Sequence, residues 1–144
     1  GLLLGAAVGA GFAAFESAGY AFTFFFEGGY DLMLEVIGLR ALLAPGGHVA
    51  WAAISGYALM LAKGDKKLSA ECFVSKTFLQ LFIVPVTLHA IWDMPIEFGS
   101  EYALVQILLC LIVWVVIFIT INNSLRQVGE KLREQQAAEQ IEEQ

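Results

Sequence analysis

The chain has 144 residues, of which 58% are hydrophobic and only 15% are charged, and its formal net charge is −6. Charged residues are scarce over the first 121 positions and dense after them, which is not the pattern of a soluble domain. The acidic balance argues against nucleic acid as a partner. These properties indicate an integral membrane protein that has the lipid bilayer as its surroundings.

Four apolar stretches are long enough to cross a bilayer as helices; they cover residues 2–26, 45–62, 73–92 and 102–121. A hydrocarbon layer of about 30 Å needs about 20 apolar residues in a helix. Each stretch must be helical inside lipid, because hydrocarbon offers no partners for backbone N–H and C=O groups. The sequence therefore predicts an all-α, polytopic transmembrane helix bundle with four spanning helices.

The segments outside these stretches differ in composition. Residues 31–43 carry acidic and apolar side chains together, which makes them a candidate interfacial helix lying flat on the membrane. Residues 122–144 are rich in Glu, Gln and Ala and indicate a soluble helical tail. The chain thus divides into a transmembrane core, residues 1–121, and a charged tail. Because it begins inside an apolar run, we expect this core to be incomplete at its N-terminus.

The basic residues predict the orientation of the bundle. They form one group between the second and third stretches and one group after the fourth, namely Lys63, Lys66, Lys67 and Lys76, then Arg126, Lys131 and Arg133. Two crossings separate the groups, so the positive-inside rule places both in the cytoplasm. The connection at residues 27–44 and the turn at residues 93–101 then face outward. We expect a prokaryotic plasma membrane, with the C-terminus in the cytoplasm.

Glu16 is the only charged residue of the first stretch. It shares a helix face with small residues repeated at intervals of four, namely Gly1, Gly5, Gly9 and Ala13. Small residues at this spacing let a second helix approach closely, so Glu16 should point at protein. It is either a neutral packing contact or a catalytic or ligand carboxylate, and its intramembrane position favours the second reading.

Both histidines fall at the predicted outer ends of helices. His48 lies in the first turn of the second stretch, where the helix dipole favours neutral imidazole. His89 and Asp93 are four residues apart and therefore share a helix face. Asp93 could orient the imidazole or bind the same metal ion. The alternatives are an interfacial anchor at His48, beside Trp51, and a simple ion pair at the end of the third stretch.

The order and spacing of these residues resemble a known family. Phe12-x-x-x-Glu16, then His48 after a connection that contains Arg40, then His89-x-x-x-Asp93 resemble the PrsW family of intramembrane proteases, a relative of the type II CAAX prenyl endopeptidases. The resemblance implies cleavage of membrane-associated protein substrates, such as anti-sigma factors, on the outer side. The family's first motif, a Glu-Glu pair followed by a basic residue, is absent here and is expected further upstream.

The resemblance also implies a catalytic site, which here consists of Glu16, His48, His89 and Asp93. In one mechanism Glu16, His48 and His89 hold a Zn²⁺ that activates water. In the other an upstream glutamate is the base, and His89 and Asp93 stabilise the oxyanion. Two further functions stay open: a non-catalytic binding or immunity protein on the same scaffold, and a haem- or metal-binding membrane protein with His48 and His89 as ligands.

Overall fold

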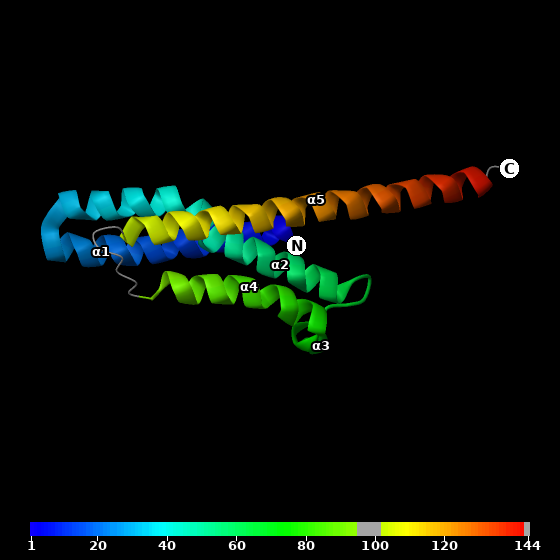
Figure 1. Cartoon of the computed structure of the whole chain (residues 1–144), viewed down its shortest axis with the longest axis horizontal. Helices are drawn as coiled ribbons and strands as arrows, with labels where there is room; N and C mark the ends of the chain where they lie inside the picture. Colours follow the sequence, from blue (N-terminus) through cyan, green and yellow to red (C-terminus); the bar gives the residue numbers. More distant parts are fainter. Residues whose placement is uncertain (95–101, 143–144) are drawn as a thin grey trace.

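The computed structural model describes residues 1–94 and 102–142, and all its regular elements there are helical (Figure 1). In chain order they are α1 (Leu2–Leu43), the 3₁₀ turn η1 (Ala44–Gly46), α2 (His48–Lys63), α3 (Ala70–Val74), α4 (Lys76–Trp92) and α5 (Tyr102–Glu142). The prediction of an all-α fold is confirmed for this part of the chain. The predicted turn at residues 93–101 lies outside the described residues from residue 95 onward.

Helix α1 is a hairpin of two arms, residues 2–28 and 30–43. Gly29 joins them with φ 79° and ψ −165°, a backbone conformation that is essentially confined to glycine. The arms run side by side in opposite directions (Figure 1). The expectation of an interfacial helix at residues 31–43 was therefore wrong. The reversal at Gly29 folds this segment back along the first arm, where Arg40 contacts Glu16.

The first arm of α1 packs on α2 through small residues of both helices. A Cβ added to Gly5 would collide with the backbone of Ala52, and one added to Gly56 would lie 2.6 Å from the carbonyl oxygen of Gly1. Such contacts leave no room for a side chain, so the two backbones approach as closely as helices can. The stripe of small residues predicted from the sequence is confirmed as a helix-packing face.

The predicted third stretch, residues 73–92, is interrupted near its start. Ser75 has an extended backbone (φ −67°, ψ 146°) and separates α3 from α4. Its hydroxyl accepts a hydrogen bond from the backbone N–H of Phe78 at 3.2 Å, which caps the first turn of α4. Helix α4 then continues through Pro85 to Trp92 and packs on α2.

By length and composition, two helical regions of the described chain qualify as membrane spans. The first is Leu2–Lys63, which contains the α1 hairpin followed by α2, and the second is Leu104–Gln140 within α5. Lys76–Trp92 is a shorter apolar helix. The apolar, all-helical character predicted from the sequence is therefore present. The number of crossings stays a prediction.

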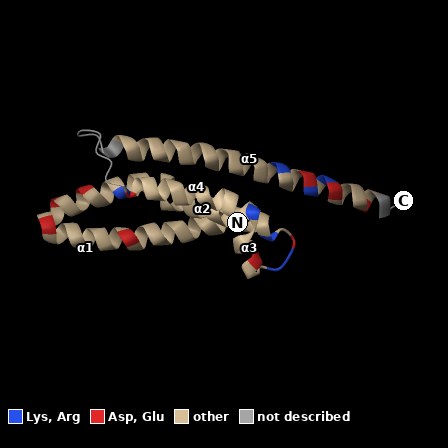
Figure 2. Cartoon of the chain, turned by 60° about the horizontal axis from the view of Figure 1, so that its bottom comes forward, with Lys and Arg blue, Asp and Glu red and all other residues tan. Residues whose placement is uncertain are grey.

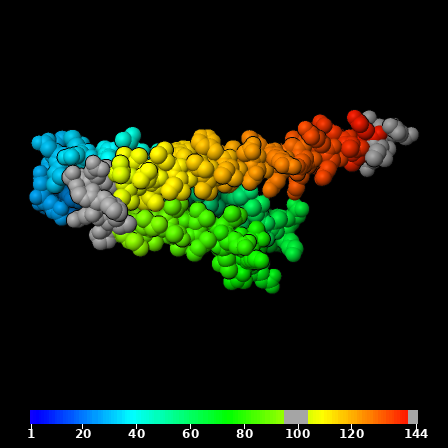
Figure 3. Space-filling view, in the orientation of Figure 1, coloured from blue at the N-terminus to red at the C-terminus, as the bar shows by residue number. Residues whose placement is uncertain are grey.

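Helix α5 covers α2 with one buried face and then leaves the bundle. The buried face consists of Gln106, Leu109, Val113, Ile117 and Thr120. The apolar members pack with the α2 residues Ala50, Ala53 and Ile54 in the core. Beyond residue 121 the helix continues without a break and extends past the rest of the molecule (Figure 3). The Nζ atom of Lys131 on this extension lies 3.3 Å from Oδ1 of Asp65, which follows α2.

Candidate active site

Glu16 is paired with an arginine from the second arm of α1. The Arg40 guanidinium contacts Oε2 of Glu16 at 2.5 Å and donates from Nε to the hydroxyl of Ser17 at 3.2 Å. It also lies over the ring of Tyr20, 4.0 Å from the centroid. The side chains of Arg40 and Glu16 are 21% and 30% exposed, so the pair is partly shielded from its surroundings. This contact holds the two arms together and fixes the Glu16 carboxylate.

His48 lies at the centre of the cluster, because α2 begins where the first arm of α1 passes it. Its Nδ1 atom is 3.5 Å from Oε2 of Glu16, and its side chain is 15% exposed. The ring is flanked by Phe12 and Trp51, each with its ring centroid 5.0 Å away. The other ring nitrogen, Nε2, is buried without a hydrogen-bond partner among the described residues. One nitrogen of His48 thus faces a carboxylate, and the other makes no hydrogen bond to the described residues.

His89 comes to this cluster from α4. Its ring centroid is 5.0 Å from that of His48, with the planes at 87°, and it stacks on Trp51 at 4.7 Å. Its Nε2 atom lies 3.4 Å from Oδ2 of Asp93, the residue that caps the C-terminal end of α4. His89 and Asp93 are more exposed than His48, with 42% and 67% of their side chains accessible. The predicted His-x-x-x-Asp pair therefore does form on one helix face.

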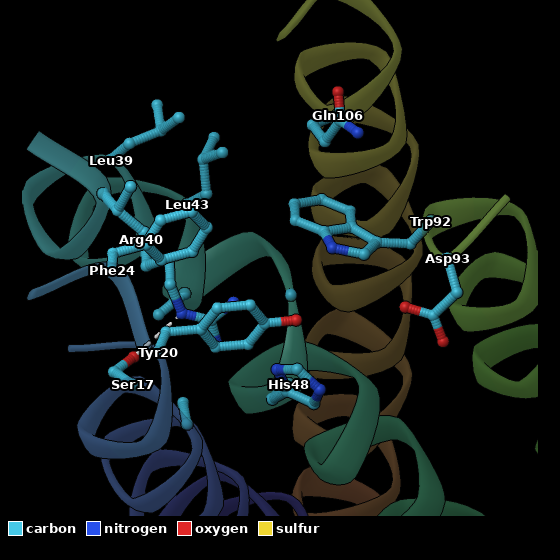
Figure 4. Close-up of a pocket in the computed structure, with 14 residues that line it drawn as sticks. Ser17, Tyr20, Phe24, Leu39, Arg40, Leu43, His48, Trp92, Asp93 and Gln106 are labelled. Carbon is cyan, nitrogen blue, oxygen red and sulfur yellow. Dashed lines mark hydrogen bonds between the residues drawn. The ribbon is translucent and has the colours of Figure 1, made fainter. Parts of the chain in front are cut away.

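Two cavities meet at His48. The larger, of about 430 Å³, lies between the hairpin of α1, η1 and the start of α5 (Figure 4). Its polar lining residues are Ser17, Tyr20, Arg40, His48, Asp93 and Gln106. The smaller, of about 270 Å³, lies between α1, α2 and α4 and includes Phe12, Trp51 and His89. His48 therefore lines both cavities.

The four candidate residues lie in one place although they come from three helices. A family model described as PrsW family intramembrane metalloprotease matches residues 1–121, which is most of the chain and includes all four residues. The chain belongs to the PrsW family. It is thus an integral membrane protein of a family of intramembrane proteases, as the resemblance predicted. Neither a curated protein nor a solved structure matches the chain.

The PrsW description implies a metal ion, which needs a matching set of donor side chains. Zn²⁺ sites use three or four His, Cys, Asp or Glu ligands converging on one point. Among the described residues no such group of three is present. Glu16, His48 and His89 are neighbours, but the Glu16 carboxylate is bonded to Arg40. This arrangement does not fit a three-ligand metal site, and we derive no step through a metal.

Two residues of this PrsW site were not among the residues predicted from the sequence. Arg40 is the single arginine of the otherwise acidic connection at residues 27–44, which was a usable signal. Gln106 gave no signal, since a lone glutamine in an apolar stretch has no motif around it. Both line the larger cavity.

Proposed function

We propose that this PrsW family member is an endopeptidase that cleaves membrane-associated protein substrates, of the anti-sigma-factor kind, near the outer face of the membrane. The observation that supports this most directly is the position of His48. Its imidazole lies between the carboxylate of Glu16 and the imidazole of His89, and its Nε2 atom has no hydrogen-bond partner in the part of the chain that the structure describes. A carboxylate, an oriented histidine and a free ring nitrogen are the parts that general-base hydrolysis requires.

In this proposal His48 is the general base. The tautomer with the proton on Nδ1 is favoured, because Nδ1 faces the Glu16 carboxylate, and this leaves Nε2 as a proton acceptor. Nε2 takes a proton from a water molecule as the water attacks the scissile carbonyl carbon. Arg40 keeps the carboxylate in place through two side-chain hydrogen bonds to the first arm of α1. Arg40 is therefore a positioning residue.

His89 and Asp93 serve the substrate's carbonyl group in the same proposal. Asp93 lies beside Nε2 of His89, so a doubly protonated ring donates to Asp93 from Nε2 and keeps Nδ1–H for the substrate. A donor placed near the scissile carbonyl stabilises the negative charge that develops on its oxygen as water adds. His48 then returns the proton that it took from water to the leaving amine as the C–N bond breaks, and a new carboxyl terminus and amine are released.

The test uses purified protein in detergent micelles and fluorophore-labelled casein as a probe substrate. We expect Glu16→Ala and His89→Ala each to lower the cleavage rate by about 10²-fold or more, since each removes a catalytic or orienting group. Glu27→Ala is the matched control, because Glu27 is an exposed acid on the same arm of α1. It should cleave like the wild type.

Full activity in both variants would refute this catalytic site. If the wild type itself cleaves nothing and Glu16→Gln lowers the melting temperature sharply, the chain is a binding protein on the same scaffold.

Zn²⁺ dependence is a second proposal, with Glu16, His48 and His89 as protein ligands. It requires Arg40 to release the carboxylate. Elemental analysis of the purified protein and loss of casein cleavage on chelation, restored by Zn²⁺, would support it. Full activity in a metal-free sample would leave the His48 mechanism as proposed.

A further inference from the structure

Helix α5 places a glutamine in the wall of the larger cavity. Gln106 is only 3% exposed, and its Oε1 atom is buried without a hydrogen-bond partner among the described residues. A buried amide oxygen without a partner loses the hydrogen bonds that water would give it, so an apolar residue would be more stable here. A ligand in the cavity that Gln106 lines is one source of the hydrogen-bond donor that its oxygen lacks.

The rest of the same helix face shows that this is specific to Gln106. The next buried residues along it, Leu109 and Val113, are apolar and pack in the core. Thr120 is the other buried polar residue of this face, and its hydroxyl donates to the backbone oxygen of Val116 at 2.7 Å. The helix thus satisfies one buried polar group internally and leaves the amide oxygen of the other, on a residue that lines the cavity, without a partner among the described residues.

The cavity around Gln106 has the size and chemistry of a binding site. Its volume of about 430 Å³ lies within the range of about 300–1,000 Å³ that is usual for ligand pockets. Gln106 and Arg40 lie on different walls, with Tyr20, Phe24 and Trp92 also around the space (Figure 4). Arg40 is already hydrogen-bonded to Glu16 and Ser17. The amide of Gln106, on the other wall, makes no hydrogen bond to the described residues through its oxygen.

We propose that Gln106 binds the backbone of the substrate segment next to the cleaved bond. A peptide unit offers one N–H and one C=O, and a carboxamide offers the complementary oxygen and NH₂ group. Recognition of the backbone suits an enzyme that must hold an extended stretch of chain. The cavity reaches His48, so a segment held there enters the catalytic cluster. The identity of the ligand rests on the proposed protease function.

The test compares wild-type protein with Gln106→Leu, using labelled casein in detergent micelles. We expect KM to rise about tenfold with kcat changed less than twofold, since one hydrogen bond made equally in ground and transition states is lost. The melting temperature should stay equal or rise, because the unpartnered amide is gone. Thr120→Val is the matched control and should leave KM unchanged.

A second measurement identifies the contacted group. A casein peptide that the wild type cleaves is resynthesised with an ester in place of one amide, at successive positions near the cleavage site. At one position the ester removes the N–H that Gln106 accepts, so KM should rise for the wild type and stay unchanged for Gln106→Leu.

Equal KM values for wild type and Gln106→Leu would overturn the inference. It would also be overturned if Gln106→Leu had a lower melting temperature and Thr120→Val showed the same change in KM. If the wild type does not cleave casein, the proposed function fails separately. Fluorescence anisotropy of labelled casein then decides: weaker binding by Gln106→Leu supports a role for Gln106, and equal binding overturns it.

Discussion

At the scale of single residues, Arg40 determines the environment of Glu16. A carboxylate in an apolar bundle is costly unless a partner compensates its charge. Here the partner is 24 residues away in sequence and reaches Glu16 only because α1 turns back on itself. Arg40 also bonds Ser17 and covers Tyr20, so one side chain joins three residues of the opposite arm.

The contact between Arg40 and Glu16 should contribute to the stability of the fold. We expect Arg40→Met to lower the free energy of unfolding by about 1–3 kcal/mol, because it leaves a partly buried carboxylate without its hydrogen-bond donor. The double variant Arg40→Met with Glu16→Gln should recover part of this loss, since the unpaired charge is then also removed. Denaturant unfolding in micelles measures both, and additive effects of the two substitutions would contradict the coupling.

At the scale of elements, the close approach of α1 and α2 positions His48. A Cβ on Gly9 would meet the backbone oxygen of His48 and lie 2.8 Å from the Cα of Val49. The absence of a side chain at Gly9 therefore sets how near the start of α2 comes to Glu16. Small residues thus set the position of His48 as well as the packing of the two helices.

Gly9→Ala tests this packing against Gly11→Ala, for which a Cβ finds nothing within 4 Å. We expect Gly9→Ala to destabilise the protein by about 1–3 kcal/mol, because the helices must separate. Gly11→Ala should be neutral or stabilising by up to about 1 kcal/mol, since alanine favours a helix over glycine. Thermal unfolding checks both, and equal melting temperatures would show that the helices do not depend on this contact.

The turn of the α1 hairpin should also contribute to stability, through Gly29. Gly29→Ala should cost about 1–3 kcal/mol, because its positive φ with extended ψ is closed to side chains. Gly38→Ala, in the second arm with open space around it, is the control and should not destabilise. If Gly29→Ala unfolds like the wild type, the turn does not require glycine. A loss of casein cleavage in Gly29→Ala would indicate in addition that activity depends on the turn, which brings Arg40 to Glu16.

At the scale of the whole molecule, the basic side chains are distributed unevenly between the two ends. Lysine and arginine gather toward the end that carries α3 and the extension of α5, whereas the turn of α1 carries acidic residues (Figure 2). The contact between Lys131 and Asp65 places the extension beside the loop after α2. The two basic groups predicted to share a side thus come from neighbouring parts of the structure.

This distribution predicts the orientation in the membrane. By the positive-inside rule the C-terminus should be cytoplasmic and the Glu16–His48–His89 cluster should lie toward the outside. A C-terminal green fluorescent protein fusion should fluoresce, and a C-terminal alkaline phosphatase fusion should be inactive. The reverse result would place the cluster toward the cytoplasm and remove extracytoplasmic proteins from the proposed substrates.

The sequence by itself determined the class of the molecule, the candidate residues and the family. Apolar runs require helices because lipid cannot bond a bare backbone, and a four-residue spacing puts side chains on one face whatever surrounds the helix. For this reason the stripe ending at Ala13 and the pair of His89 with Asp93 could be predicted. These features are local, so they depend on neighbours within a few residues.

Only the tertiary structure decided which groups meet. The fold-back of residues 30–43 followed from one backbone angle at Gly29, which apolar periodicity does not encode. That turn gave Glu16 its partner Arg40, and the approach of α5 put Gln106 into the cavity. Contacts across 24 or more residues depend on how whole helices pack, and packing is a property of surfaces that form only once the helices are assembled.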